Sequence, residues 1–332
     1  MILLGCDITQ NGEKGKLGLF HWYLGRFARL DSISHGGISQ ALYLLAWFFA
    51  SYLYHGLGVT LGYHRLLTHK SLVVPAWLKY FIVSGGYLCL MGSPITWVGV
   101  HRLHHQKSDL DGDPHSPRGG FWHALVGWMF HTRDAQPDDE LRKQCKDLMA
   151  NPFVRWLGDD HGPRSPLICL ACCIIFRVAL FAFFGAGVVV ANLAATGITF
   201  LSTQLVNAVC HLPSAGYRTE ETIDDSRNVW WVGILALGEG WHNNHHAMPT
   251  SARHGIKWYE VDVTWYTIWL LEKLGLSKNV VRPATQPVRI DGGAAATART
   301  TGHRRPPTQT AELRPDSLGV TAQQSQEPSF RQ

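Results

Sequence analysis

Long stretches without charged side chains constrain this chain more than any other feature of its sequence. Residues 32–64 contain no Asp, Glu, Lys or Arg, and residues 38–62 supply about the 20 apolar residues that a bilayer crossing needs. A second apolar stretch, residues 166–210, is interrupted only by Arg177 and has room for two crossings joined by a turn near Gly185. We therefore expect an all-α integral membrane protein with spans at about 38–62, 166–185 and 188–210. Arg177 has no explanation at this level, since a charge at the centre of a span costs about 2.5 kcal/mol or more.

Composition narrows the class further. Charged residues make up only 17% of the chain and hydrophobic residues 46%, and the net charge of +5 includes no basic block of the kind that binds nucleic acid. The thirteen tryptophans suit the aromatic belts found at membrane surfaces. A disordered chain, a collagen-like chain and a disulfide-stapled secreted domain are thereby excluded.

The other segments are assigned by length and polarity. Residues 263–271 are apolar but too short to span, and suit a helix lying along the membrane interface. Residues 1–37 carry seven charged side chains and are expected to form a polar or interfacial segment. Residues 283–332 are rich in Ala, Thr, Pro and Gly without an apolar period, which predicts a disordered tail. Residues 38–282 then form the functional domain.

Histidines cluster in three short boxes. Their sequences are His64-Arg-Leu-Leu-Thr-His69, His101-Arg-Leu-His104-His105 and His242-Asn-Asn-His245-His246. Positions i, i+3 and i+4 of a helix share a side, so the second and third boxes each offer three imidazoles on one side. Clustering partly charged rings is unfavourable unless something binds them, and imidazole suits iron, zinc, copper or nickel. The boxes therefore predict a metal site.

The spans allow all three boxes to lie on one side of the membrane. Only 31 residues separate His69 from His101, too few for two crossings, so residues 73–97 must dip into the bilayer or lie along its surface. Two crossings lie between His105 and His242, which returns the third box to the same side. His211 follows the last span and stands four residues after Asn207, which makes the pair a further ligand with a polar partner. His115 and His254 are assigned to interfacial hydrogen bonding instead.

In these residues the chain resembles the membrane-bound fatty acid desaturases, particularly the bacterial and plastid-type Δ9 branch. The resemblance covers residues 58–276 and extends beyond the boxes. It includes the segments Asp-Gly-Asp-Pro-His at 111–115, Leu-Val-Asn-Ala-Val-Cys-His at 205–211 and Gly-Glu-Gly-Trp-His-Asn-Asn at 238–244.

The resemblance implies a fold in which transmembrane helices lie under a cytosolic helical cap that holds a histidine-rich di-iron site, with the boxes on the cytoplasmic side of a multi-pass protein. One iron would take His64, His69, His101, His105 and His245. The other would take His104, His211, His242 and His246, with a water held by Asn207. Two electrons reduce the irons, O2 is the co-substrate, and hydrogen is removed from adjacent carbons to leave a cis double bond and water. The protein supplies position, dryness and redox tuning, while the metal supplies the hard chemistry.

The resemblance also bears on the electron donor and on alternative functions. No fused electron carrier is visible, so a separate donor such as ferredoxin or cytochrome b5 is expected to dock on the box face. A di-iron hydroxylase or ketolase of the same membrane class shares the boxes. A membrane metal transporter is the alternative from another class, but it would place its ligands at mid-bilayer rather than outside the spans.

The resemblance to the desaturases also implies where the substrate binds. The residue that closes the acyl tunnel in related desaturases lies twelve positions before the first box, which is Tyr52 here, followed by Gly56 one turn later. Trp97 is a further tunnel residue. Acyl-CoA members carry an Arg-Asp pair just before the second box, where this chain has Gly99 and Val100. We therefore expect an acyl chain esterified to a membrane lipid, with acyl-CoA as the next alternative, then acyl carrier protein.

The family usually has four spans, whereas this chain shows three apolar segments of sufficient length. Residues 1–37 are too charged to supply the fourth. We expect a true start upstream of Met1, which would account for the difference. An amino terminus on the far side of the membrane is the alternative.

Overall fold

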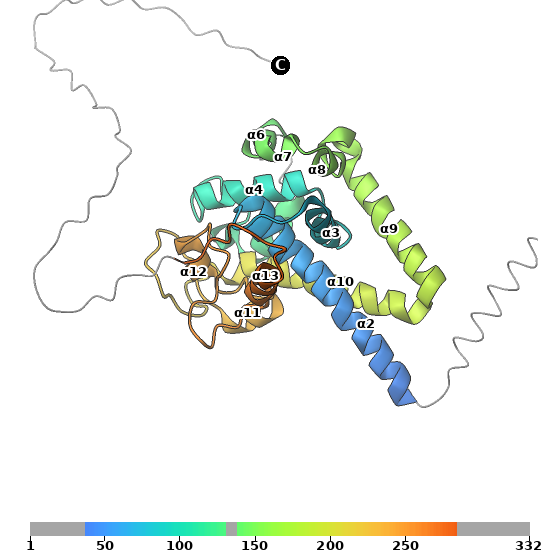
Figure 1. The fold of residues 1–332 in the computed structure, drawn as a ribbon. Helices are drawn as coiled ribbons and strands as arrows, with labels where there is room; N and C mark the ends of the chain where they lie inside the picture. The colour runs from blue at the N-terminus through green and yellow to red at the C-terminus, as the bar shows by residue number, and fades with distance from the viewer. Residues whose placement is uncertain (1–36, 131–137, 284–332) are drawn as a thin grey trace, which may run out of the picture. The chain divides into compact units, whose positions relative to one another are not determined.

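The structure, a computed structural model, describes residues 37–130 and 138–283 (Figure 1). These residues form helices joined by loops, and within these two ranges β-structure is limited to isolated bridges such as that between Val73 and Lys278. The prediction of an all-α fold is confirmed. The expectations for residues 1–36 and 284–332 lie outside the described residues.

Three helices in the described ranges are long and apolar enough to cross a membrane. Helix α2 (Gly37–Leu57) continues into the π-helix η1 (Gly58–Thr68), so that a helical segment of 32 residues ends at the first histidine box. Helices α9 (Ser165–Phe184) and α10 (Ala186–Val209) are separated only by Gly185, whose φ of 85° interrupts the helical path where the sequence predicts a turn.

The long helices bury one side and expose the other. Helix α10 packs against both α2 and α9, and buries the polar side chains of Asn192 and Thr196 in these contacts. The outer sides carry large apolar side chains, among them Phe49 on α2 and Ile175 on α9. An apolar exterior around a partly polar interior is the arrangement that a lipid environment favours.

Arg177, which the sequence left unexplained, points into the protein. Its guanidinium donates hydrogen bonds to the carbonyl oxygens of Leu88 (3.1 Å) and Cys173 (3.0 Å) and to the hydroxyl of Thr196 (2.9 Å). Leu88 follows the end of helix α3 (Ala76–Tyr87), so the arginine joins α3, α9 and α10, and its charge is stabilised by carbonyl and hydroxyl oxygens of these helices.

The segment between the first two boxes does not cross the membrane. Helix α3 has 12 residues and spans about 18 Å, well short of a hydrocarbon core of roughly 30 Å. A Cβ on Gly58 would lie 2.1 Å from the backbone nitrogen of Gly86, so only glycine allows this approach of α3 to the long helix. The chain then turns, and Ser93 caps helix α4 (Pro94–Lys107), which carries the second box.

The remaining helices are shorter, and together with α3 and α4 we call them the cap. These shorter helices are η2 (Pro117–Gly119), η3 (His123–Gly127), α6 (Asp138–Gln144), α7 (Lys146–Met149), α8 (Pro152–Trp156), η4 (Asp159–Arg164), α11 (Trp230–Leu235), α12 (His242–Ala247) and α13 (Val263–Lys273). Helix α12 carries the third box. Helix α13 covers the segment for which the sequence predicts an interfacial helix; it buries Ile268 and exposes Tyr266 and Trp269.

Candidate metal centre

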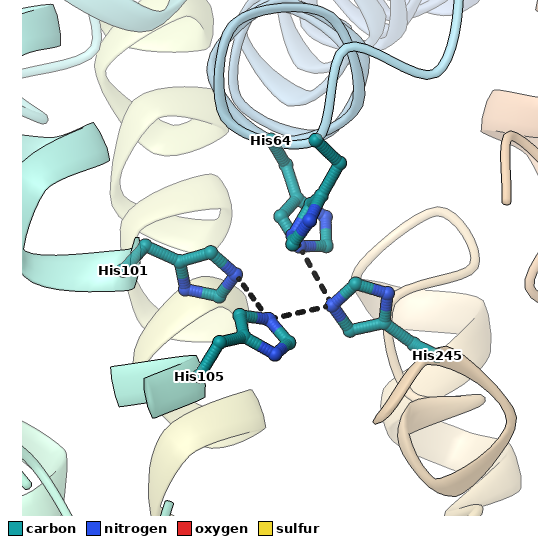
Figure 2. Close-up of side chains that lie close together, drawn as sticks. His64, His101, His105 and His245 are labelled. Carbon is teal, nitrogen blue, oxygen red and sulfur yellow. Dashed lines mark hydrogen bonds between the residues drawn. The ribbon is translucent and has the colours of Figure 1, made fainter. Parts of the chain in front are cut away.

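Five histidines from three segments converge at the carboxyl-terminal end of the long helix formed by α2 and η1. His64 comes from η1 and His69 follows it, while α4 contributes His101 and His105, and α12 contributes His245. The Nε2 atoms of His64 and His245 lie 3.1 Å apart, and those of His245 and His105 lie 3.0 Å apart. Figure 2 shows the rings of His64, His101, His105 and His245 turned toward one another. We call these residues the five-histidine group.

Four further histidines form a second cluster, the four-histidine group. Its members are His104 of α4, His211 at the end of α10, and His242 and His246 of α12. The Nε2 atoms of His211 and His242 are 2.9 Å apart. His211, which lies far from any box in the sequence, is fully buried here because α10 returns to the cap immediately before it.

The structure therefore divides each of the two later boxes between the groups. The i and i+4 residues stay together, as His101 and His105 do in one group and His242 and His246 in the other. The intervening i+3 residue, His104 or His245, turns to the opposite group. On a helix, i+4 is displaced by about 40° from i and i+3 by about 60° in the other sense, so a helix running between two centres can serve both. All nine histidines singled out in the sequence are brought together in this way.

The remaining sequence-predicted residues line one cavity beside the histidines. Tyr52, Gly56, Trp97 and Asn207 all contribute to its wall. The cavity also contacts His64 and His101 of the five-histidine group and His242 of the four-histidine group. The amide of Asn207 lies 3.5 Å from Gln204 Oε1 on the same helix. The cavity thus reaches both groups at one place.

Four carboxylates, to which the sequence assigned no role, hold the outer nitrogens of the histidines. Asp113 accepts a hydrogen bond from His104 Nδ1 (2.9 Å), Asp109 from His211 Nδ1 (2.7 Å), and Asp224 from His246 Nδ1 (2.6 Å). Glu239 Oε2 lies 2.7 Å from His64 Nδ1. A metal-binding histidine usually donates its outer N–H to such an acceptor. Asp109 and Asp113, four and eight positions after the second box, could therefore have been recognised from the sequence as such acceptors.

The electrostatics of this arrangement favour neutral imidazoles facing ionised carboxylates. Burial lowers the pKa of His69, His101, His105, His242 and His245 well below the ordinary value, with neighbouring histidines adding to the effect, and burial lowers the pKa of His246 to about 4. Although burial raises it, the pKa of Asp109 is brought down to about 2 by its hydrogen bonds from His211 and Ser116. Neutral rings are the form in which histidine binds metal.

The residues fit a transition-metal cation. In a neutral ring whose Nδ1–H is donated to a carboxylate, the lone pair is on Nε2. The Nε2 atoms of His104 and His246 are buried, point into the four-histidine group and have no hydrogen-bond partner among the described residues. Buried acceptors that face one another without donors are unfavourable. A cation between them removes that cost, and an all-imidazole set suits a first-row transition metal.

A buried arginine ties the first box to the segment around the third. The Arg65 guanidinium donates to both carboxylate oxygens of Asp262 (2.9 and 3.0 Å), to Glu239 Oε1 (3.1 Å) and to the Ala252 carbonyl (2.7 Å). His254 Nδ1 lies 3.1 Å from the other oxygen of Glu239. Burial raises the pKa of Glu239, but His64 and Arg65 outweigh it and hold this pKa well below the usual range.

His115 and His254, assigned from the sequence to interfacial hydrogen bonding, are both buried directly behind the groups. The ring centroid of His115 lies 4.3 Å from that of His104, and the ring centroid of His254 lies 4.4 Å from that of His245. They therefore belong to the surroundings of the metal-binding rings.

Comparison with known proteins agrees with this architecture. A family model described as fatty acid desaturase matches residues 39–272, which include all nine histidines. An sn-2 palmitoyl-lipid 9-desaturase of Nostoc sp. (strain 36) is 42% identical over 263 residues, covering 75% of this chain and 89% of the relative. An sn-1 stearoyl-lipid 9-desaturase of Anabaena variabilis is 43% identical over 226 residues, covering 68% and 79%. Delta-9 acyl-lipid desaturase 1 of Arabidopsis thaliana is 39% identical over 234 residues, covering 70% and 73%.

The family match extends over more than two thirds of the chain, and the relatives are similar along most of their own length. The resemblance noted in the sequence is confirmed, and the helical membrane fold with its clustered histidines is consistent with it. This chain belongs to the fatty acid desaturase family and is an oxidoreductase of membranes.

Proposed function

We propose that the enzyme introduces a cis double bond at the Δ9 position of a saturated acyl chain that is esterified to a membrane lipid. Two iron ions are held by the nine histidines, with Asn207 holding a water, O2 is the co-substrate, and electrons come from a separate ferredoxin or cytochrome b5. The observation that carries this proposal is the cavity that contacts both histidine groups and whose wall includes apolar side chains such as Val59 and Val206. An acyl chain in it lies against both metal positions at once.

The protein residues perform three tasks in this reaction. The histidines, oriented by their carboxylates, hold the irons, which when bound supply the oxidising power that removes hydrogen from unactivated methylene groups at the expense of O2. The walls of the cavity hold the acyl chain so that the same pair of carbons is presented each time. Burial of the rings excludes water from the site, which protects reactive species from side reactions.

The preference for a lipid-bound substrate rests on the start of the second box. A Cβ on Gly99 would lie 3.1 Å from Leu141 Cβ and 3.2 Å from the Leu141 carbonyl oxygen, so helix α6 occupies the place of a charged side chain there. Arg65 is fully buried and paired with carboxylates, and Arg102 is paired with Asp147. The arginines of the first two boxes are thus already paired with carboxylates, so neither supplies a free positive charge for a CoA phosphate. The relatives from Nostoc and Anabaena described above act, by their names, on acyl lipids.

The alternatives have less support. A hydroxylase or ketolase shares the boxes, but the relatives described above are named as desaturases. A metal transporter would bind ions at mid-bilayer between interrupted helices, whereas His64 and His69 lie at one end of their long helix and His211 follows the end of α10. A multi-pass topology with all histidines at the cytoplasmic ends of the spans accommodates these positions.

The function is tested by expression in a host that lacks its own desaturase. We expect new monounsaturated acyl chains in the membrane lipids, identified by mass spectrometry after derivatisation that locates the double bond. Purified protein supplied with reduced ferredoxin or cytochrome b5 is then offered labelled stearoyl groups as glycerolipid and as CoA thioester. Hydroxylated or keto products would contradict desaturation, and turnover of the thioester alone would contradict the lipid substrate.

Tyr52 is expected to limit the length of the acyl chain. The Tyr52 hydroxyl donates a hydrogen bond to the Leu235 carbonyl on α11. The Tyr52 ring lines the cavity on α2 about 18 Å along the helix from His64, where we expect the ring to form the barrier to the acyl chain. Tyr52→Ala should shift the products toward longer chains by removing this barrier. The matched variant Tyr52→Phe keeps the ring and should retain the original profile. Gas chromatography of total fatty acids measures both, and an unchanged profile in an active Tyr52→Ala enzyme would contradict the assignment.

A further inference from the structure

The two histidine groups differ in how firmly their rings are oriented. In the four-histidine group, three of the four rings donate Nδ1–H to an aspartate of their own. The aspartates are themselves held: Asp109 accepts from the Ser116 hydroxyl (2.6 Å), and Asp113 accepts from the Asp109 backbone nitrogen (2.8 Å). Asp224 accepts from the Ser226 hydroxyl (2.6 Å). These rings are therefore fixed in orientation and tautomer by the fold.

The five-histidine group has much less support of this kind. Among the described residues, Glu239 is the one carboxylate paired with a ring of this group, and it is shared between His64, Arg65 and His254. The Nδ1 atom of His245 is buried and has no hydrogen-bond partner in the described part of the chain. Within the ranges that the structure describes, His69 and His105 pair with other imidazoles rather than with carboxylates: His69 Nε2 lies 3.1 Å from His64 Nε2, and His105 Nε2 lies 3.1 Å from His101 Nε2.

We infer that the four-histidine group is the pre-organised site, which takes up its metal ion first and releases it last, and that the five-histidine group is filled second. This inference rests on the proposed di-iron function. Outer partners of metal-bound histidines typically change metal affinity about 10–100-fold each, and three dedicated aspartates outnumber one shared glutamate. The five-histidine group offers one donor more, but four of its five rings have no carboxylate partner among the described residues and must be ordered when the ion binds, which opposes binding.

The consequence for the enzyme is a built-in difference between the two metal positions. The ion in the four-histidine group faces rings whose basicity is raised by three carboxylates, whereas the other ion faces mostly unsupported rings.

The order of filling is tested by titrating the metal-free, full-length protein in detergent with Co²⁺, whose visible absorption depends on the number and geometry of its ligands. We expect two successive steps, each of one ion per chain, with metal content checked by mass spectrometry. His242→Ala should remove the first step and His69→Ala the second, which assigns each step to a group. Asp109→Asn and Asp224→Asn should each weaken the first step about 10–100-fold and leave the second unchanged.

Two further variants act as controls. Asp225 is the neighbour of Asp224, but the side chain of Asp225 pairs with Arg118 rather than with a histidine. Asp225→Asn should therefore alter neither step. Glu239→Gln should weaken the second step. Uptake of two ions in a single step, or aspartate variants that weaken both steps equally, would overturn the inferred order while leaving the di-iron proposal standing. A folded protein that takes up neither Co²⁺ nor Fe²⁺ would instead contradict the di-iron proposal.

Discussion

Replacing His211 by alanine is expected to abolish desaturation. His211 is buried, holds its ring against Asp109, and presents Nε2 2.9 Å from His242 Nε2 in the four-histidine group. Its removal opens a coordination position and takes the imidazole donor away from the Asp109 carboxylate. Because loss of an outer partner alone costs about 10–100-fold in affinity or activity, loss of the ligand itself should exceed 100-fold. Product formation and iron content per chain measure the effect, and each of the other eight histidines should behave in the same way.

His123→Ala is the matched control for this series. His123 also lies on a cap helix, but it is not a member of either histidine group, and its replacement should leave product formation near the wild-type level. Asn207→Ala should lose most activity yet retain metal, because the amide is proposed to act through a water. A His211→Ala enzyme with full activity would leave eight ligands and remove this histidine from the site.

Arg65→Met is expected to cause the largest loss of stability. The guanidinium is completely buried between Asp262 and Glu239, so methionine leaves two carboxylates buried without their cation. Removal of one partner from a buried ionic network typically costs about 3–5 kcal/mol, equivalent to a fall in melting temperature on the order of 10 °C for a domain of this size. Activity should fall as well, since Glu239 contacts His64. Thermal unfolding in detergent and product formation report the two effects.

Arg282→Met provides the comparison for Arg65. Arg282 also pairs with a carboxylate, that of Glu272, but half of its side chain is exposed. Exposed pairs contribute roughly 0–1 kcal/mol, so this variant should unfold within a few degrees of the wild type. Equal melting temperatures for the Arg65 and Arg282 variants would contradict the role given to the buried network.

Much of this protein follows from local sequence pattern. A span is recognisable because a bilayer demands about 20 apolar residues in succession, and a helical box is recognisable because positions i and i+4 share a face. The number of crossings between His69, His101 and His242 follows from the lengths of the apolar segments. This number predicted that the three boxes lie on the same side of the membrane. His211 and Asn207 were found in the same way, from their position at the end of the last span. These features depend on neighbouring residues along one chain segment, which a sequence displays directly.

The tertiary structure decided the features that join distant segments. Arg177 is explained by the carbonyl of Leu88, 89 positions away, and His211 by Asp109, 102 positions away. The family resemblance implied the division of α4 and α12 between two groups, but its physical reason lies in where the helices sit. The 100° between i+3 and i+4 becomes two sites only when a second set of rings faces each row. Asp109, Asp113, Asp224 and Glu239 were missed for the same reason. A hydrogen bond to an imidazole Nδ1 requires an oxygen within about 3 Å, and only packing determines which of the acidic residues of the chain comes that close.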